Sequence, residues 1–113
     1  MERDSVYLLD IVSSAQIIRS YLEGVALDEF LWDTKLQDSV IRRLEIIGEA
    51  AGRISAQFRD KHPEIPWSKM RGMRNWMIHH YDDVDLHIVW NTAQDDIQQL
   101  LELLESLVPP EAG

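Results

Sequence analysis

Four segments of the sequence repeat apolar residues at steps of three and four, and this periodicity restricts the chain to helical folds. The longest of these apolar stripes is formed by Leu36, Val40, Leu44, Ile47, Ala51, Ile54 and Phe58. No segment alternates apolar and polar residues, and no hairpin signal occurs, so the sequence predicts no strands.

The first half of the chain predicts two long helices. The first is expected over residues 4–23 and stops at Gly24, which suits the end of a helix. A single turn is expected over residues 27–31. The second helix is expected from Asp33 or Thr34, either of which can cap it, to about residue 62, where Pro63 stops it.

The second half predicts two more helices. Pro66 suits the first turn of a third helix over residues 67–80, whose core face is Met70, Met73 and Met77. The fourth helix is expected to carry a near-perfect heptad stripe, formed by Leu86, Trp90, Ala93, Ile97, Leu100, Leu104 and Leu107. Leu101 and Leu103 widen this stripe and favour a buried or dimerising helix. The expected fold is an all-α antiparallel four-helix bundle with short extra turns, which dimerises and forms one domain over residues 1–113.

Two glycines interrupt the second helix. Gly48 and Gly52 lie one turn apart, and glycine costs about 1 kcal/mol relative to alanine inside a helix. The pair therefore predicts a close approach to another helix, or a role in a partner interface.

The composition limits the functional classes. The 113 residues carry a net charge of −9, which argues against a broad nucleic-acid-coating surface but not against a small cationic site. The sequence has no cysteine, no membrane-length apolar run and no signal-peptide core at its N-terminus. We therefore expect a cytoplasmic protein that does not associate with membranes.

The segment from Arg74 to Tyr81 carries the candidate chemistry. Arginine, histidine and tyrosine stand there in the order Arg-x4-His-x-Tyr, with His79 between them. No acidic residue lies between Glu64 and Asp82, so we expect a local anion-attracting patch. The other basic residues of this patch are Lys69, Arg71 and His80. Their charges could equally be solvated on an exposed helix face.

Helical geometry separates the two principal residues. Arg74 and Tyr81 fall on nearly the same face of an ideal helix, and so do Asn75 and His79, whereas Arg74 and His79 diverge by about 140°. Either the helix loosens around His79, or two copies of the segment face each other across a two-fold axis. Such a dimer would place two arginines and two histidines around one cleft.

The residues in this cleft would suit metal-independent cleavage of RNA. A histidine can remove the proton of a ribose 2′-hydroxyl or protonate the leaving 5′-oxygen. An arginine can stabilise the charge on the non-bridging phosphate oxygens. Arg74 and His79 are the candidate catalytic residues, with Asn75 and Arg71 in support. DNA lacks the 2′-hydroxyl and is not expected to be a substrate.

Each candidate residue could instead have a purely structural role. Arg74 could pair with a carboxylate of another helix, and His79 could cap a helix C-terminus. Tyr81 could be a half-buried ring with its hydroxyl in water. The four histidines, His62, His79, His80 and His87, form neither a His-x3-His pair nor an HExxH pattern, so no metal or other cofactor is expected.

Three blocks of the sequence, in order, resemble the HepT-like (DUF86) branch of the HEPN superfamily. They are Gln37–Ala51, His62–Trp67 and Gly72–Tyr81, the last followed by Val84-Asp85. The resemblance implies a dimeric helical bundle that is the ribonuclease toxin of a type VII HepT/MNT toxin–antitoxin pair. It also implies that Arg74 and His79 occupy the active-site positions.

The resemblance also implies a partner. This is an antitoxin, a small nucleotidyltransferase of the MNT class, which transfers AMP from ATP to the motif tyrosine, here Tyr81. A bulky anionic adduct beside a cationic cleft would keep RNA out. Two alternatives remain. The chain could be a non-catalytic module that holds nucleotide or substrate for such a nucleotidyltransferase, or a purely structural helical dimer.

Overall fold

The computed structural model describes the backbone of residues 2–79 and 85–108, and the side chains of residues 3–73 and 85–108. Within these ranges the chain is helical and contains no strand, which confirms the expected all-α fold. The elements in order are α1 (Glu2–Leu22), α2 (Leu27–Trp32), α3 (Thr34–Arg53), α4 (Ala56–Lys61), α5 (Trp67–His79), α6 (Leu86–Asn91), the π-helical turn η2 (Thr92–Asp96) and α7 (Ile97–Leu104).

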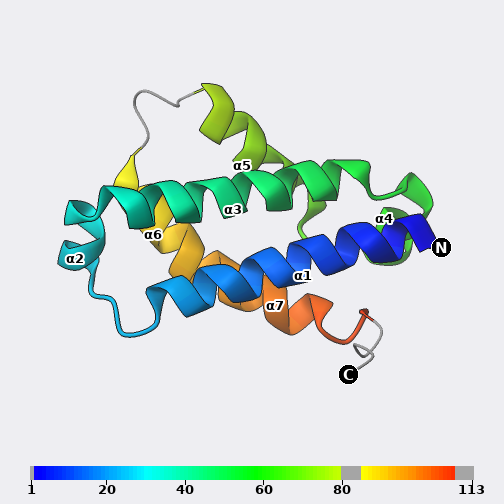
Figure 1. Cartoon of the computed structure of the whole chain (residues 1–113). Helices are drawn as coiled ribbons and strands as arrows, with labels where there is room; N and C mark the ends of the chain where they lie inside the picture. The colour runs from blue at the N-terminus through cyan, green and yellow to red at the C-terminus, as the bar shows by residue number, and fades with distance from the viewer. Residues whose placement is uncertain (1, 80–84, 109–113) are drawn as a thin grey trace.

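Four long helical runs form the bundle, and α2 and α4 are short extra turns. Helices α1 and α3 lie side by side and run in opposite directions (Figure 1). Helix α5 packs against α3, whereas α7 packs against α1. The last run, α6–η2–α7, crosses behind α1 and α3 in the view of Figure 1. Helix α3 is therefore packed between α1 and α5.

The core contains the apolar stripes that the sequence indicated. On α1 the buried members are Leu8, Ile11, Ala15, Ile18 and Leu22. On α3 they are Val40, Leu44, Ile47 and Ala51, and Ile54 is buried directly after the end of this helix. Helix α2 joins this core through Phe30, which is fully buried and lies 5.3 Å from the ring of Trp90 on α6. Burial of each large aliphatic side chain stabilises the fold by roughly 1.5–3 kcal/mol.

Gly24 ends the first helix, as predicted. Its φ of 74° lies in the left-handed region, which glycine adopts without steric penalty. The backbone N–H of Val25 donates a 3.0 Å hydrogen bond to the carbonyl of Leu22, which closes the end of α1.

The prediction that the second helix continues to residue 62 was wrong, because the chain breaks at Ile54 and Ser55. Both residues have extended backbone angles, and Ser55 caps α4 by accepting a 3.1 Å hydrogen bond from the N–H of Phe58. The buried carboxylate of Asp4 on α1 accepts bonds from the Ser55 amide at 2.8 Å and from the Ser55 hydroxyl at 2.7 Å. A tertiary contact thus satisfies the backbone group that a continuous helix would have bonded itself.

The last helix is also interrupted, by the π-helical turn η2. The N–H of Ile97 reaches the carbonyl of Thr92, five residues back. Buried residues on this run follow at steps of four, at Val89, Ala93, Ile97 and Leu101. A step of four drifts by about 40° around an ideal α-helix, and the wider turn offsets this drift. The predicted heptad stripe therefore faces the core, but the helix that carries it is not α-helical throughout.

The two glycines of α3 differ in their surroundings. Gly48 is buried, but Gly52 is exposed and has no atom within 4 Å of the place where a Cβ would stand. The predicted close approach is therefore wrong for Gly52.

Replacing Asp4→Asn should lower the free energy of unfolding by about 1–3 kcal/mol, because an amide cannot accept both Ser55 bonds and a buried donor is then left unpaired. Chemical denaturation measures the difference. Asp10→Asn, an exposed position on the same helix, is the matched control and should change stability by less than about 0.5 kcal/mol.

The stabilisation by Asp4 should depend on pH. Burial raises the pKa of this carboxyl, but the hydrogen bonds from the Ser55 hydroxyl and amide outweigh burial, so the pKa lies below its ordinary 3.8. A carboxyl of this kind stabilises the fold above its unfolded pKa and loses that contribution as the pH falls through its folded pKa. The difference between wild type and Asp4→Asn should therefore be full near pH 6 and shrink below about pH 4. A constant difference would contradict this assignment.

Candidate functional site

Helix α5 carries the motif, and its first half is firmly anchored. Trp67 is buried, and its indole N–H donates a 3.0 Å hydrogen bond to the carbonyl of His62. Ile65 and Met70 are also buried, and Met73 is half-buried against the core. The expected core face of this helix is therefore confirmed for Met70 and Met73.

The backbone of α5 remains α-helical through His79. Of the two arrangements that the sequence left open, loosening of the helix does not occur within its described length. Position 74 lies one turn beyond buried Met70, whereas positions 75 and 79 continue the line of the exposed Arg71. Positions 74 and 79 are thus about 140° apart around one regular helix.

The structure places four of the predicted site residues, Arg71, Arg74, Asn75 and His79, on α5. The side chains of the last three lie outside the described residues, and Tyr81 does so completely. Their roles remain predictions.

The basic segment is less isolated than its sequence indicated, because the fold brings a carboxylate to it. Lys69 Nζ lies 3.2 Å from Asp96 Oδ1, which belongs to η2. This pair could not be predicted from local sequence, because the two residues are 27 positions apart. Asp96 also lies in a π-helical turn that the sequence did not predict. Lys69 is therefore partly neutralised, and Arg71 is the exposed cation on the described part of α5 that no ion pair includes.

Two open grooves lie away from α5. The larger, of about 580 Å³, runs between the end of α1 and η2 and is lined by Gln16, Arg19, Ser20, Leu22, Glu23, Gly24, Ala93 and Gln94. The smaller, of about 190 Å³, lies between α1 and α3 and is lined by Tyr7, Asp10, Arg42, Ile46, Glu49, Ala50 and Arg53. Arginines and carboxylates occur in both, so neither is a strongly cationic phosphate site.

The described ranges offer neither a metal-binding cluster nor a membrane-spanning helix. Over residues 2–79 and 85–108, no group of three histidine, aspartate or glutamate side chains is placed to hold a metal ion. None of the helices in the same ranges is both long and apolar enough to cross a membrane.

Comparison with known proteins identifies the family. A family model described as "Ribonuclease HepT-like" matches residues 11–107. A protein of Thermococcus cleftensis named "Probable ribonuclease HepT" is 43% identical over 101 residues, which are 89% of this chain and 92% of that protein.

Other relatives agree with this match. "Putative RNase MJ0127" of Methanocaldococcus jannaschii is 35% identical over 105 residues, covering 89% of this chain and 87% of its own. "Putative RNase TTE0752" of Caldanaerobacter subterraneus subsp. tengcongensis is 32% identical over 111 residues, covering 98% and 99%. No solved structure gave a significant match.

Replacing Asp96→Asn should lower the free energy of unfolding by less than about 1 kcal/mol, because the pair with Lys69 is solvent-exposed and such pairs contribute little. The neighbouring change Ile97→Ala is the matched comparison. It empties a fully buried position and should cost about 2–5 kcal/mol. Urea denaturation measures both, and an equal loss for the two variants would mean that the ion pair is a major support of α5.

Proposed function

The chain belongs to the HepT-like ribonuclease family, and we propose that it is a metal-independent endoribonuclease, the toxin of a type VII toxin–antitoxin pair. The proposal covers one domain over residues 1–113, acting in the cytoplasm. The observation that carries it is the Arg-x4-His-x-Tyr motif, whose Arg74 and His79 belong to α5, within a family match that spans most of the chain.

Cleavage would proceed by internal attack. One His79 removes the proton of the ribose 2′-hydroxyl, whose oxygen then bonds to the adjacent phosphorus. The bond from phosphorus to the 5′-oxygen breaks, and a second His79 supplies the proton that this oxygen takes up. Arg74 stabilises the negative charge on the non-bridging oxygens. Arg71 and Asn75 are assigned supporting contacts to the phosphate backbone.

A homodimer would complete this site. Because α5 stays regular through His79, one copy presents positions 74 and 79 to different sides. A two-fold axis beside α5 lets Arg74 of one copy and His79 of the other face the same phosphate. This arrangement supports a composite cleft between protomers.

Control of the toxin would act on Tyr81. A cognate nucleotidyltransferase of the MNT class directs the phenolic oxygen of Tyr81 onto the α-phosphorus of ATP, and pyrophosphate leaves as the phenolic proton is released. The added phosphodiester brings negative charge and bulk next to the cationic segment. RNA is then repelled and blocked.

Replacing His79→Ala should reduce cleavage of single-stranded RNA by at least about 100-fold, because a proton-transfer group is lost. The measurement is fluorogenic RNA cleavage by unmodified dimer, in the presence of EDTA, with the oligomeric state checked by sedimentation. His87→Ala, an exposed histidine on α6, is the matched control and should retain activity. Full activity of the His79→Ala protein would remove this residue from the mechanism. Absence of cleavage by the wild type would favour the non-catalytic binding module.

Incubation with the cognate nucleotidyltransferase and ATP should add the mass of one AMP per chain and abolish cleavage. Tyr81→Phe should prevent the mass gain, whereas Tyr21→Phe, an exposed tyrosine on α1, should not. Intact-mass spectrometry followed by peptide mapping reads the result. Modification at Tyr21 instead would contradict the assigned acceptor.

A further inference from the structure

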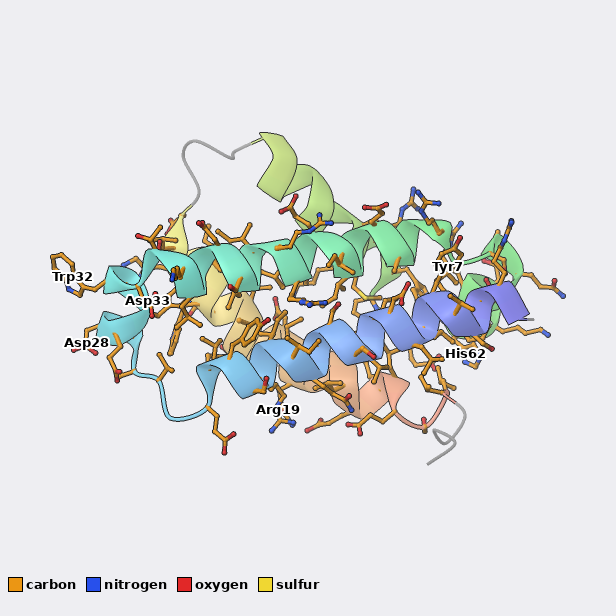
Figure 2. All side chains as sticks on the ribbon, in the orientation of Figure 1. Tyr7, Arg19, Asp28, Trp32, Asp33 and His62 are labelled. Carbon is orange, nitrogen blue, oxygen red and sulfur yellow. The ribbon has the colours of Figure 1, made fainter. Side chains whose placement is uncertain are left out.

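Trp32 is the most exposed large apolar residue among those described, with 88% of its surface in water. It is the last residue of α2, and Figure 2 shows its ring pointing away from the body of the molecule. The fold buries other aromatic residues efficiently, since Phe30 on the same helix is 0% exposed and Trp67 is 7% exposed. Indole rings left in water in this way are typical anchors of protein interfaces.

The backbone that carries Trp32 is held on both sides. Phe30, two residues earlier, is buried against Trp90, and its carbonyl accepts a 2.9 Å hydrogen bond from Gln37 Nε2. Asp33, the next residue, caps α3 by accepting a 3.1 Å bond from the N–H of Leu36. The ring is therefore presented on a fixed support, so little backbone entropy is lost when a partner covers it.

The sequence on either side of Trp32 is acidic. Residues 20–41 contain five acidic side chains and one lysine. Asp28, Glu29 and Asp33 lie on or beside α2, and none of them takes part in an ion pair within the described residues. Figure 2 shows Asp28 and Asp33 at the same end of the molecule as Trp32. This surface is an apolar anchor with an anionic rim.

We propose that the surface formed by Trp32, Asp28, Glu29 and Asp33 is the docking site for a protein partner that offers an apolar pocket bordered by lysine and arginine. The negative charge of this surface favours a basic protein over the other possible partners. An RNA strand would meet repulsion between its phosphates and the rim. A second copy of the chain would set two identical acidic rims against each other. A basic protein surface gains both burial of the indole and neutralisation of the rim.

The inference rests on the proposed function for the identity of that partner, the cognate nucleotidyltransferase. Helix α2 packs against α6, and α6 begins soon after the segment that contains Tyr81. A partner anchored on Trp32 is thus held beside α6, the helix that follows the motif in the sequence.

The test is binding of the nucleotidyltransferase encoded beside this chain's gene, measured by calorimetry at low and high salt. Trp32→Ala should raise Kd by about 30-fold or more, whereas Leu103→Ala, an exposed leucine on α7, should change Kd by less than about twofold. Asp28→Asn should weaken binding clearly at low salt and much less at high salt. Glu105→Gln, at an exposed position directly after α7, is the matched control and should leave Kd unchanged at both salt concentrations. Asp28 is chosen because Glu29 and Asp33 also bond the backbone of helix ends.

Several results would overturn the proposal. They are an unchanged Kd for Trp32→Ala, a wild-type chain that does not bind the enzyme, a shift in dimer dissociation caused by Trp32→Ala, or a raised KM for RNA with the same variant. The last two would reassign the surface to self-association or to base stacking. RNA cleavage by the wild-type chain is measured in the absence of the nucleotidyltransferase. The docking proposal and the nuclease proposal can therefore fail independently. Unchanged thermal melting of Trp32→Ala shows that the fold is intact.

Discussion

Packing of α3 against both α1 and α5 is the interaction on which the rest of the structure depends. The buried residues of α3, among them Leu44 and Ile47, close the core with α1, and α3 also supports the helix that carries the motif. A cavity in α3 would therefore alter the position of α5 without touching any site residue. The core and the position of α5 therefore depend on one shared helix.

The electrostatics of the chain follow from how its charges are distributed. The chain has a net charge of −9, but residues 65–81 contain no aspartate or glutamate. The fold places the carboxylate of Asp96 beside Lys69, near the start of this segment. Among the described side chains of α5, the positive charge outside an ion pair is consequently that of Arg71. A small cationic site on an anionic body would restrict tight contact to a few phosphates and disfavour extended coating of nucleic acid.

The sequence predicted most of the fold because apolar periodicity is a local property. The stripes of α1 and α3, the stop at Gly24 and the turn at α2 all followed from spacing and capping rules. It could not predict the break at Ser55, since the Asp4 carboxylate that stabilises it lies 51 residues away. The π-turn was hidden for a related reason, because the predicted stripe at Trp90, Ala93 and Ile97 is compatible with an ordinary helix as well as with a widened turn.

For the site, the sequence supplied the residue types and their spacing. It left open whether the helix loosens around His79, and the described backbone of α5 is α-helical up to that residue. It gave no sign of Trp32, because a tryptophan next to Phe30 and Leu31 is indistinguishable from core in one dimension. Only the three-dimensional arrangement separates a buried ring from one in water.

The π-turn has a consequence for length variation in this family. A widened turn takes up one residue more than an ordinary helical turn over the same rise. Loss of a single residue from 94–96 would convert η2 into an ordinary α-helical turn. Ala93 and Ile97 would then stand three positions apart instead of four and would both still face inward. The same deletion in α3, which is covered on two sides, would rotate everything after it by about 100°. Insertions and deletions between homologues are therefore expected to concentrate in the last helix, well away from the central one.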